Sequence, residues 1–240
     1  MATYLWICCI VFFAGFTQGV SGFGSVLVAL PLLALFLDVK TVIPLVALCG
    51  LSITVVLLIG LRRFLDWRKI YPLVAGATLG IPVGVFFLKQ VDSAVIQSVV
   101  GFFLISYSAY ALLRPSTLPG LRGPWSYVFG FLGGCCGGAI GAAGPPVIVY
   151  TSAQPWSKDQ IKVTLQGFFV TSDLMVVAAQ AAAGVTTLSV VGFFLISLPA
   201  LTLGTYLGSH VYGIIKEVWY RKIILILLAF LGSLMIYKTL

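Results

Sequence analysis

Charged side chains are scarce in this chain of 240 residues. Asp, Glu, Lys and Arg make up only 8% of it, six of them are acidic, and 60% of the residues are hydrophobic. So few charges exclude an ordinary soluble domain, whose surface carries many more. The apolar residues instead form recurring runs of roughly 20 residues, which is the length that crosses a bilayer. We therefore predict an integral membrane protein.

The chain also has few of the groups that catalysis or metal binding requires. There is one histidine, His210, and the five cysteines lie in apolar runs without CxxC spacing. We expect no metal site and no cofactor. An enzyme would need a nucleophile, a base or a metal set in one cavity, so the sequence favours a protein that is not an enzyme. Cys135 and Cys136 are interpreted as small packing residues, although a thiol there could contact a sulfur compound.

The excess of basic residues indicates membrane orientation. Lys and Arg outnumber Asp and Glu by 14 to 6, for a net charge of +8. These cations sit in short connectors between the apolar runs, and no soluble domain is present to bind DNA. We expect membrane lipid to surround the protein, and we expect no nucleic-acid partner. The oligomeric state is left open.

Eight apolar segments fall into two sets of four. In order they cover residues 3–37, 41–61, 70–88, 94–113, 125–155, 163–184, 188–215 and 218–237. The boundary between the sets is the polar connector "RPSTLPGLRG". We therefore divide the chain into an N-terminal repeat, 1–113, a connector, 114–123, and a C-terminal repeat, 124–240.

The second set repeats the pattern of the first. At an offset of 115 residues, Gly15, Phe16, Gly19, Gly22 and Pro31 match Gly130, Phe131, Gly134, Gly137 and Pro146. At an offset of 124, Gly80 and Gly84 match Gly204 and Gly208. Internal duplication of this kind is common in secondary transporters.

The positive-inside rule distinguishes two topologies. If all eight segments crossed the membrane, the 14 basic residues would divide equally between the two faces. If the Gly-broken first segment of each set instead enters and returns on one face, eleven basic residues share the cytoplasmic face: Arg62, Arg63, Arg68, Lys69, Arg114, Arg122, Lys158, Lys162, Lys216, Arg221 and Lys222. Lys40, Lys89 and Lys238 lie opposite, as do both termini.

We therefore predict an all-α polytopic membrane protein with two inverted repeats. Each repeat has a Gly-broken re-entrant helical hairpin followed by three transmembrane helices. Irregular backbone at membrane depth is tolerated only where protein buries it or water lines it. The two hairpin tips should therefore meet in a protected cavity near the midplane.

The hairpin tips are the expected binding site for a small anion. In "GFTQGVSGFGS" the polar and glycine residues precede a helix that starts near Val26, with Ser21 or Ser25 able to cap it. In "GGAIGAAGPPVIVY" two prolines begin the next helix. Bare N–H groups and the helix dipole at such N-termini attract anions. The candidate binding residues are Gln18, Ser21, Gly22, Gly24, Ser25, Gly137, Gly138, Gly141 and Gln166. In the alternative interpretation these glycines only allow close helix packing, and Gln166 only satisfies a neighbouring helix.

Asp173 is the candidate proton carrier. It is the only acidic residue well inside an expected span. An ionised Asp at that depth costs about 2.5 to 3.5 kcal/mol, so it must be compensated or protonated. Its alternative role is that of a neutral helix clip.

The whole chain resembles the TauE/SafE family of sulfite exporters. The likeness rests on "GFTQGVSGFGSVLVALPLL", on "GFLGGCCGGAIGAAGPPVIVY" and on "LPALTLGTYLGSHV". Phe23 and Ser25 stand where the family commonly has glycine. The resemblance implies transport of sulfur-containing or organic anions, such as sulfite, a sulfonate or thiosulfate, across the bacterial inner membrane. We expect a proton-coupled secondary transporter, and the alternative is a passive anion channel.

Overall fold

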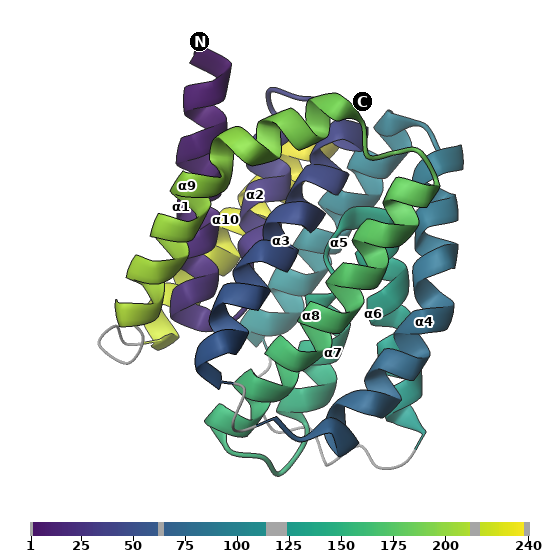
Figure 1. Ribbon diagram of the computed structural model, residues 1–240, viewed down its shortest axis with the longest axis vertical. Helices are drawn as coiled ribbons and strands as arrows, with labels where there is room; N and C mark the ends of the chain where they lie inside the picture. The colour runs from purple at the N-terminus through teal and green to yellow at the C-terminus, as the bar shows by residue number, and fades with distance from the viewer. Residues whose placement is uncertain (1, 62–64, 114–123, 212–216, 238–240) are drawn as a thin grey trace.

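The chain folds into a bundle of α-helices. The computed structural model describes residues 2–61, 65–113, 124–211 and 217–237, and these ranges contain helices and no strand (Figure 1). The first half contains α1 (Ala2–Ser21), α2 (Ser25–Leu33), α3 (Val39–Leu61), α4 (Trp67–Gln90) and α5 (Ser93–Leu113). The second half contains α6 (Trp125–Ile140), α7 (Gly144–Ser152), α8 (Lys158–Ala182), α9 (Leu188–Val211) and α10 (Glu217–Tyr237).

The prediction of a multi-pass membrane protein is confirmed by the lengths of these helices. In the described part of the chain, six helices are long and apolar enough to cross a membrane, namely α1, α3, α4, α5, α8 and α9. The described side chains of α10 form a shorter apolar stretch from Leu225 to Tyr237. The described helices expose many large apolar side chains, such as Phe102 and Phe230, which a bilayer would cover.

The first expected segment of each half is divided into two helices. The helix breaks occupy residues 22–24 and 141–143. Gly22, Gly24 and Gly141 have positive φ angles of 80°, 97° and 71°, which side chains other than glycine rarely tolerate. Figure 1 shows α1 beginning at the same end of the bundle where α10 ends, and the connection from α2 to α3 also lies at that end.

The helix breaks of the two halves correspond at an offset that is one helical turn larger than the offset of the sequence match. Gly22 and Gly141 are 119 residues apart, and so are the first residues of α2 and α7, Ser25 and Gly144. The expected offset of 115 paired Gly22 with Gly137, which lies inside α6. Glycines that recur every three or four residues along a packing face produce almost equal matches at neighbouring turns. The sequence match alone therefore selected the wrong turn.

Glycines bring each long hairpin helix into backbone contact with a helix of the other half. A Cβ on Gly19 of α1 would lie 2.6 Å from the carbonyl oxygen of Thr205 in α9. A Cβ on Gly138 of α6 would lie 2.5 Å from the carbonyl oxygen of Ile81 in α4. Close backbone approach of this kind is the usual role of small residues in membrane helices. Gly138 therefore has a close helix-packing contact, whatever else it does.

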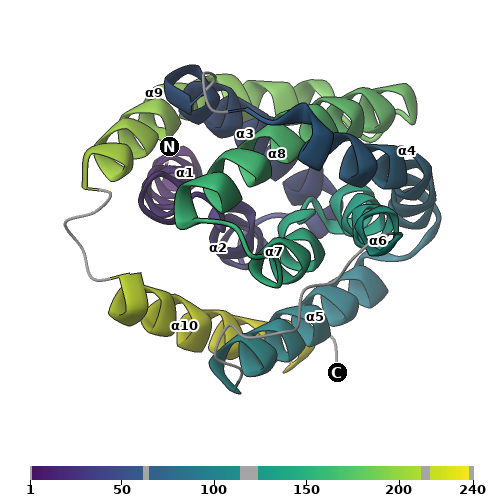
Figure 2. The same ribbon diagram turned by 90° about the horizontal axis from the view of Figure 1, so that it is seen from below.

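The hairpins lie at the centre of the bundle. Figure 2 shows α1, α2, α6 and α7 in the middle, with α3 and α8 along one side and α5 and α10 along the other. α3 packs against α8, α5 against α10, α1 against α9, and α4 against α6. The surrounding helices therefore enclose the two breaks.

Helix α8 begins earlier than we expected. Its first residue is Lys158 rather than Val163, because Ser157 and Gln160 form a capping box at its start. The Ser157 hydroxyl accepts from the Gln160 backbone N–H at 3.2 Å, and the Gln160 side-chain oxygen (Oε1) accepts from the Ser157 backbone N–H at 3.1 Å. Lys162 therefore belongs to the helix and not to a connector. Arg62, Arg63, Arg114, Arg122, Lys216 and Lys238 of the predicted charge split lie outside the described residues.

Candidate functional site

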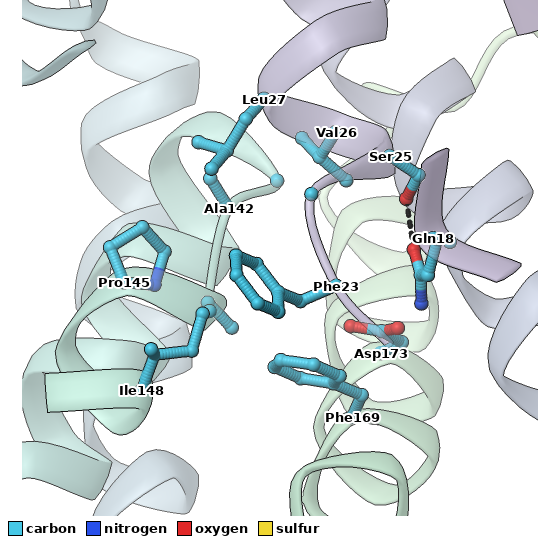
Figure 3. Close-up of a pocket in the computed structure, with 15 residues that line it drawn as sticks. Gln18, Phe23, Ser25, Val26, Leu27, Ala142, Pro145, Ile148, Phe169 and Asp173 are labelled. Atoms are coloured by element: carbon cyan, nitrogen blue, oxygen red, sulfur yellow. Dashed lines mark hydrogen bonds between the residues drawn. The ribbon is translucent and has the colours of Figure 1, made fainter. Parts of the chain in front are cut away.

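One cavity lies where the two helix breaks meet α3 and α8. Its volume is about 40 Å³, which is more than one water molecule needs. Figure 3 shows its walls, with Phe23 between the second hairpin on one side and Phe169 and Asp173 on the other. The lining residues are Gln18, Phe23, Gly24, Ser25, Val26, Leu27, Gly50, Gly141, Ala142, Ala143, Gly144, Pro145, Ile148, Phe169 and Asp173.

The N-terminus of α2 opens into this cavity without a side-chain cap. Gly24 is the N-cap residue and its φ of 97° bends the chain into the helix. Among the described residues, no hydrogen-bond acceptor meets the N–H groups of Ser25, Val26 or Leu27. These three residues also line the cavity. Free N–H groups at a helix start carry partial positive charge, which favours an anion.

The prediction that Ser21 or Ser25 caps α2 is wrong. The Ser21 hydroxyl lies 2.7 Å from the Thr17 carbonyl oxygen and 2.6 Å from that of Phe23, so its one proton goes to one of these. Ser25 donates instead to the side-chain oxygen of Gln18. Both hydroxyls therefore have acceptors on α1 or in the break, and the helix start remains uncapped.

The N-terminus of α7 offers fewer donors than that of α2. Gly144 begins the helix, and Pro145 and Pro146, which follow it, have no N–H group. The preceding N–H groups of Gly141 and Ala142 donate to carbonyl oxygens of α6 at 2.9 and 3.3 Å. The two tips are therefore not equivalent, and most of the free N–H groups belong to α2.

Asp173 supplies the acidic side chain of the cavity. It is half-buried on α8, and its carboxylate lies 3.5 Å from the position a Cβ would take on Gly50 of α3. Thr54 of α3 is its polar neighbour, and the Thr54 hydroxyl lies 3.0 Å from the Gly50 carbonyl oxygen. The cavity lining contains no Lys and no Arg. No basic side chain of the lining therefore neutralises this carboxyl.

Two buried glutamines connect α8 to the two hairpins. The Gln166 amide donates to the carbonyl oxygen of Gly22, and the Gln180 amide donates to that of Gly138 at 3.4 Å. The last carbonyls of a helix have no partner within it, and the Gly22 carbonyl follows directly after α1. Both glutamines are fully buried, and the side-chain oxygen of each has no partner.

The structure brings together about half of the predicted binding residues. Gln18, Gly24, Ser25, Gly141 and Asp173 line the cavity. Ser21, Gly22 and Gln166 lie around the first break but do not line the cavity. Gly137 and Gly138 lie in the last turns of α6, where added Cβ atoms would face Ala143 and Ile81. Cys135 and Cys136 are not part of the lining either.

Sequence reasoning missed several residues of this site. Phe23 was noted only as a departure from a family pattern, and Gln180 and Lys162 were not considered as part of the site. Lys162 lies beside the first break, with its Cγ 3.3 Å from the position a Cβ would take on Gly22. A signal was present, because Lys162, Gln166, Asp173 and Gln180 recur at helical spacing and share one face of α8.

A comparison with protein-family models matches residues 7–235 to the family described as "Sulfite exporter TauE/SafE". The match covers both hairpins, the cavity and nearly all of the described helices. No curated protein and no solved structure matches the chain significantly.

Proposed function

Because the chain belongs to the TauE/SafE family of sulfite exporters, we propose that it is a secondary transporter of small sulfur-containing anions of the sulfite, sulfonate or thiosulfate type. The family supports a sulfite-exporter-type membrane transporter, and the six apolar helices support a multi-pass protein. We further assign it to the bacterial inner membrane. The observation that carries the proposal is one cavity lined by both helix breaks and an acidic side chain.

The proposed architecture is two inverted repeats, residues 1–113 and 124–240. It is supported by the pairing of contacts between the halves. Gly19 approaches Thr205, Ser209 and Gly208, and Gly138 approaches Ile81, Val85 and Gly84 in the same way. These residues correspond at offsets of 119 and 124. Three crossings per half would place the second half in the opposite orientation, with each hairpin re-entering from its own side.

The proposed anion site is the N-terminus of α2. The free N–H groups of Ser25, Val26 and Leu27, together with the helix dipole, would hold an oxyanion without a basic side chain. Gln18 can add a side-chain N–H, since its oxygen accepts from Ser25. The α7 terminus, with Gly144, would contribute more weakly because two prolines follow.

The proposed coupling residue is Asp173. Asp173 lines the cavity with no Lys or Arg in the lining, so an ionised carboxylate would repel an anion in the same cavity, whereas a neutral carboxylic acid would not. Protonation would therefore accompany anion binding, and both would move across the membrane together.

Transport into proteoliposomes tests this proposal. The purified protein is reconstituted, a proton gradient is imposed, and accumulation of sulfite is measured against protein-free vesicles. A proton-coupled transporter accumulates sulfite above its external concentration. The alternative function, a passive anion channel, allows sulfite to equilibrate but not to accumulate, because the same helix ends could line a pore. If sulfite does not enter the vesicles at all, with or without a proton gradient, both the transporter and the channel functions are contradicted.

A further inference from the structure

The ring of Phe23 occupies the centre of the cavity. Figure 3 shows it between Pro145, Ala142 and Ile148 of the second hairpin and Phe169 and Asp173 of α8. Phe23 is half-buried and packs against the core cluster that includes Ile148 and Phe169. It comes from the break before α2, next to the free N–H groups. The ring therefore forms part of the apolar wall of the cavity that the α2 terminus also lines.

The backbone around Phe23 holds the ring in this position. Gly22 and Gly24, on either side of it, have positive φ angles of 80° and 97°. The Ser21 hydroxyl lies 2.6 Å from the Phe23 carbonyl oxygen and 3.5 Å from its N–H. On the far side, Gln166 fixes the Gly22 carbonyl. The ring is thus attached to a braced turn and not to a loose loop.

The space that remains beside the ring is small. The cavity volume is about 40 Å³, which is on the scale of a small group such as SO₃. A carbon chain attached to that group would meet apolar side chains where it extends toward the second hairpin. Phe23, Ala142, Pro145 and Ile148 line that side.

From this geometry we propose that Phe23 is the specificity-determining residue, which limits the transporter to compact inorganic oxyanions and excludes sulfonates with an alkyl chain. The inference rests on the proposed anion site, and it narrows the substrate class within that function. Methanesulfonate and butane-1-sulfonate have the same head group and the same single charge and differ only in chain length. Their relative binding therefore reports the space beside the ring rather than the strength of the anion site.

The test is competition with sulfite exchange in proteoliposomes. The wild-type protein, Phe23→Leu and Phe23→Ala are compared, and inhibition by sulfite, methanesulfonate and butane-1-sulfonate is measured for each. We expect butane-1-sulfonate to inhibit the wild type poorly, and to gain about tenfold or more in apparent affinity in Phe23→Ala. Phe23→Leu should give an intermediate gain, and it keeps the test available if the alanine variant folds poorly. Sulfite affinity should change much less in both.

Phe13→Ala is the matched control, since it removes the same ring from an exposed position of α1, where Phe13 is 60% exposed. It should leave the ratio of the apparent affinities for methanesulfonate and butane-1-sulfonate unchanged. Equal inhibition of the wild type by both sulfonates, or an unchanged ratio in both Phe23 variants, would overturn the inference while leaving the transporter function in place. If no variant and no wild-type protein exchanges sulfite, the proposed function fails together with the inference.

Discussion

The side-chain amide of Gln166 donates to the carbonyl oxygen of Gly22, and so joins α8 to the first helix break across 144 residues of sequence. Gln180 makes the corresponding contact with Gly138 of α6, 3.4 Å long, at the other end of the same helix. Asp173 lies midway between them, seven residues from each. One face of α8 thus contacts both hairpins and carries the only acidic side chain of the cavity. Any shift of α8 would therefore change its contacts with both hairpins.

The first prediction concerns this contact. Gln166→Leu removes the donor and leaves the buried Gly22 carbonyl without a partner, which costs about 1–3 kcal/mol. We expect a lower thermal midpoint in detergent and slower sulfite exchange, because the tip that presents the α2 terminus loses its brace. Gln90→Leu, at an exposed position at the end of α4, is the control and should leave both unchanged. If Gln166→Leu exchanges sulfite at the wild-type rate, the hydrogen bond from Gln166 to Gly22 is dispensable for transport.

The second prediction separates backbone strain from anion binding. Gly24 and Gly184 both have positive φ, and a Cβ on either meets no atom closer than 3.7 Å. Gly24→Ala and Gly184→Ala should therefore each cost about 1–2 kcal/mol of stability. Of these two glycines, Gly24 lines the cavity and Gly184 does not.

We expect Gly24→Ala to lower sulfite affinity roughly tenfold, which corresponds to one lost hydrogen bond to a charged group of about 1.5 kcal/mol. Gly184→Ala should bind sulfite normally. Binding by the purified variants, compared at matched folded fractions, provides the measurement. Equal affinities for the two variants would place the anion site away from α2.

The sequence predicted the helices of this fold well and the site only in part. Long apolar runs with polar punctuation predicted where most of the described helices lie, but α4 and α8 begin earlier than expected. At α8 a polar capping box extends the helix into residues that look like a connector. Glycine clusters located both breaks approximately. The register of the second break was missed, because the packing glycines of α6 continue for one more turn than those of α1.

The site residues that were missed depend on tertiary contacts. Nothing in the sequence indicates that Phe23 faces the second hairpin, or that Ser25 binds Gln18 instead of capping its own helix. Of the two buried glutamines of α8, Gln166 was predicted, and Gln180 was detectable by its helical spacing from Asp173. Their hydrogen-bond partners, in contrast, are backbone carbonyls of distant helices, which only the fold identifies.

A third prediction tests the packing glycines. A Cβ on Gly84 would lie 2.2 Å from the carbonyl oxygen of Cys135, so Gly84→Ala requires α4 and α6 to separate. We expect most of this variant to be lost or aggregated on size-exclusion chromatography in detergent. Gly192→Ala, where a Cβ meets nothing within 4 Å, should elute as the wild type does. A monodisperse Gly84→Ala protein with wild-type yield would contradict the close packing of these two helices.

The fourth prediction concerns orientation. Figure 1 shows the starts of α4 and α8 at one end of the bundle and the connection between α4 and α5 at the other. Single cysteines at Asp66 and Ser157, in a background without the five native cysteines, should be protected from an impermeant reagent added to intact cells, because basic residues near these helix starts favour the cytoplasm. A cysteine at Asp92 should react. Labelling at Asp66 with protection at Asp92 would invert the proposed orientation.

The last prediction concerns proton coupling by Asp173. Asp173→Asn keeps the size of the side chain and its ability to form hydrogen bonds but cannot gain or lose a proton. We expect proton-driven sulfite accumulation to be abolished, while exchange of sulfite without a gradient continues. Thr54→Val is the companion variant, because it removes the hydroxyl partner and keeps the carboxyl group. It should retain accumulation with an altered dependence on pH, since the balance between the two protonation states shifts when a hydrogen bond to one of them is lost. If Asp173→Asn accumulates sulfite as the wild type does at matched protein levels, Asp173 acts only as a structural link between α3 and α8, and the coupling proton travels by another group.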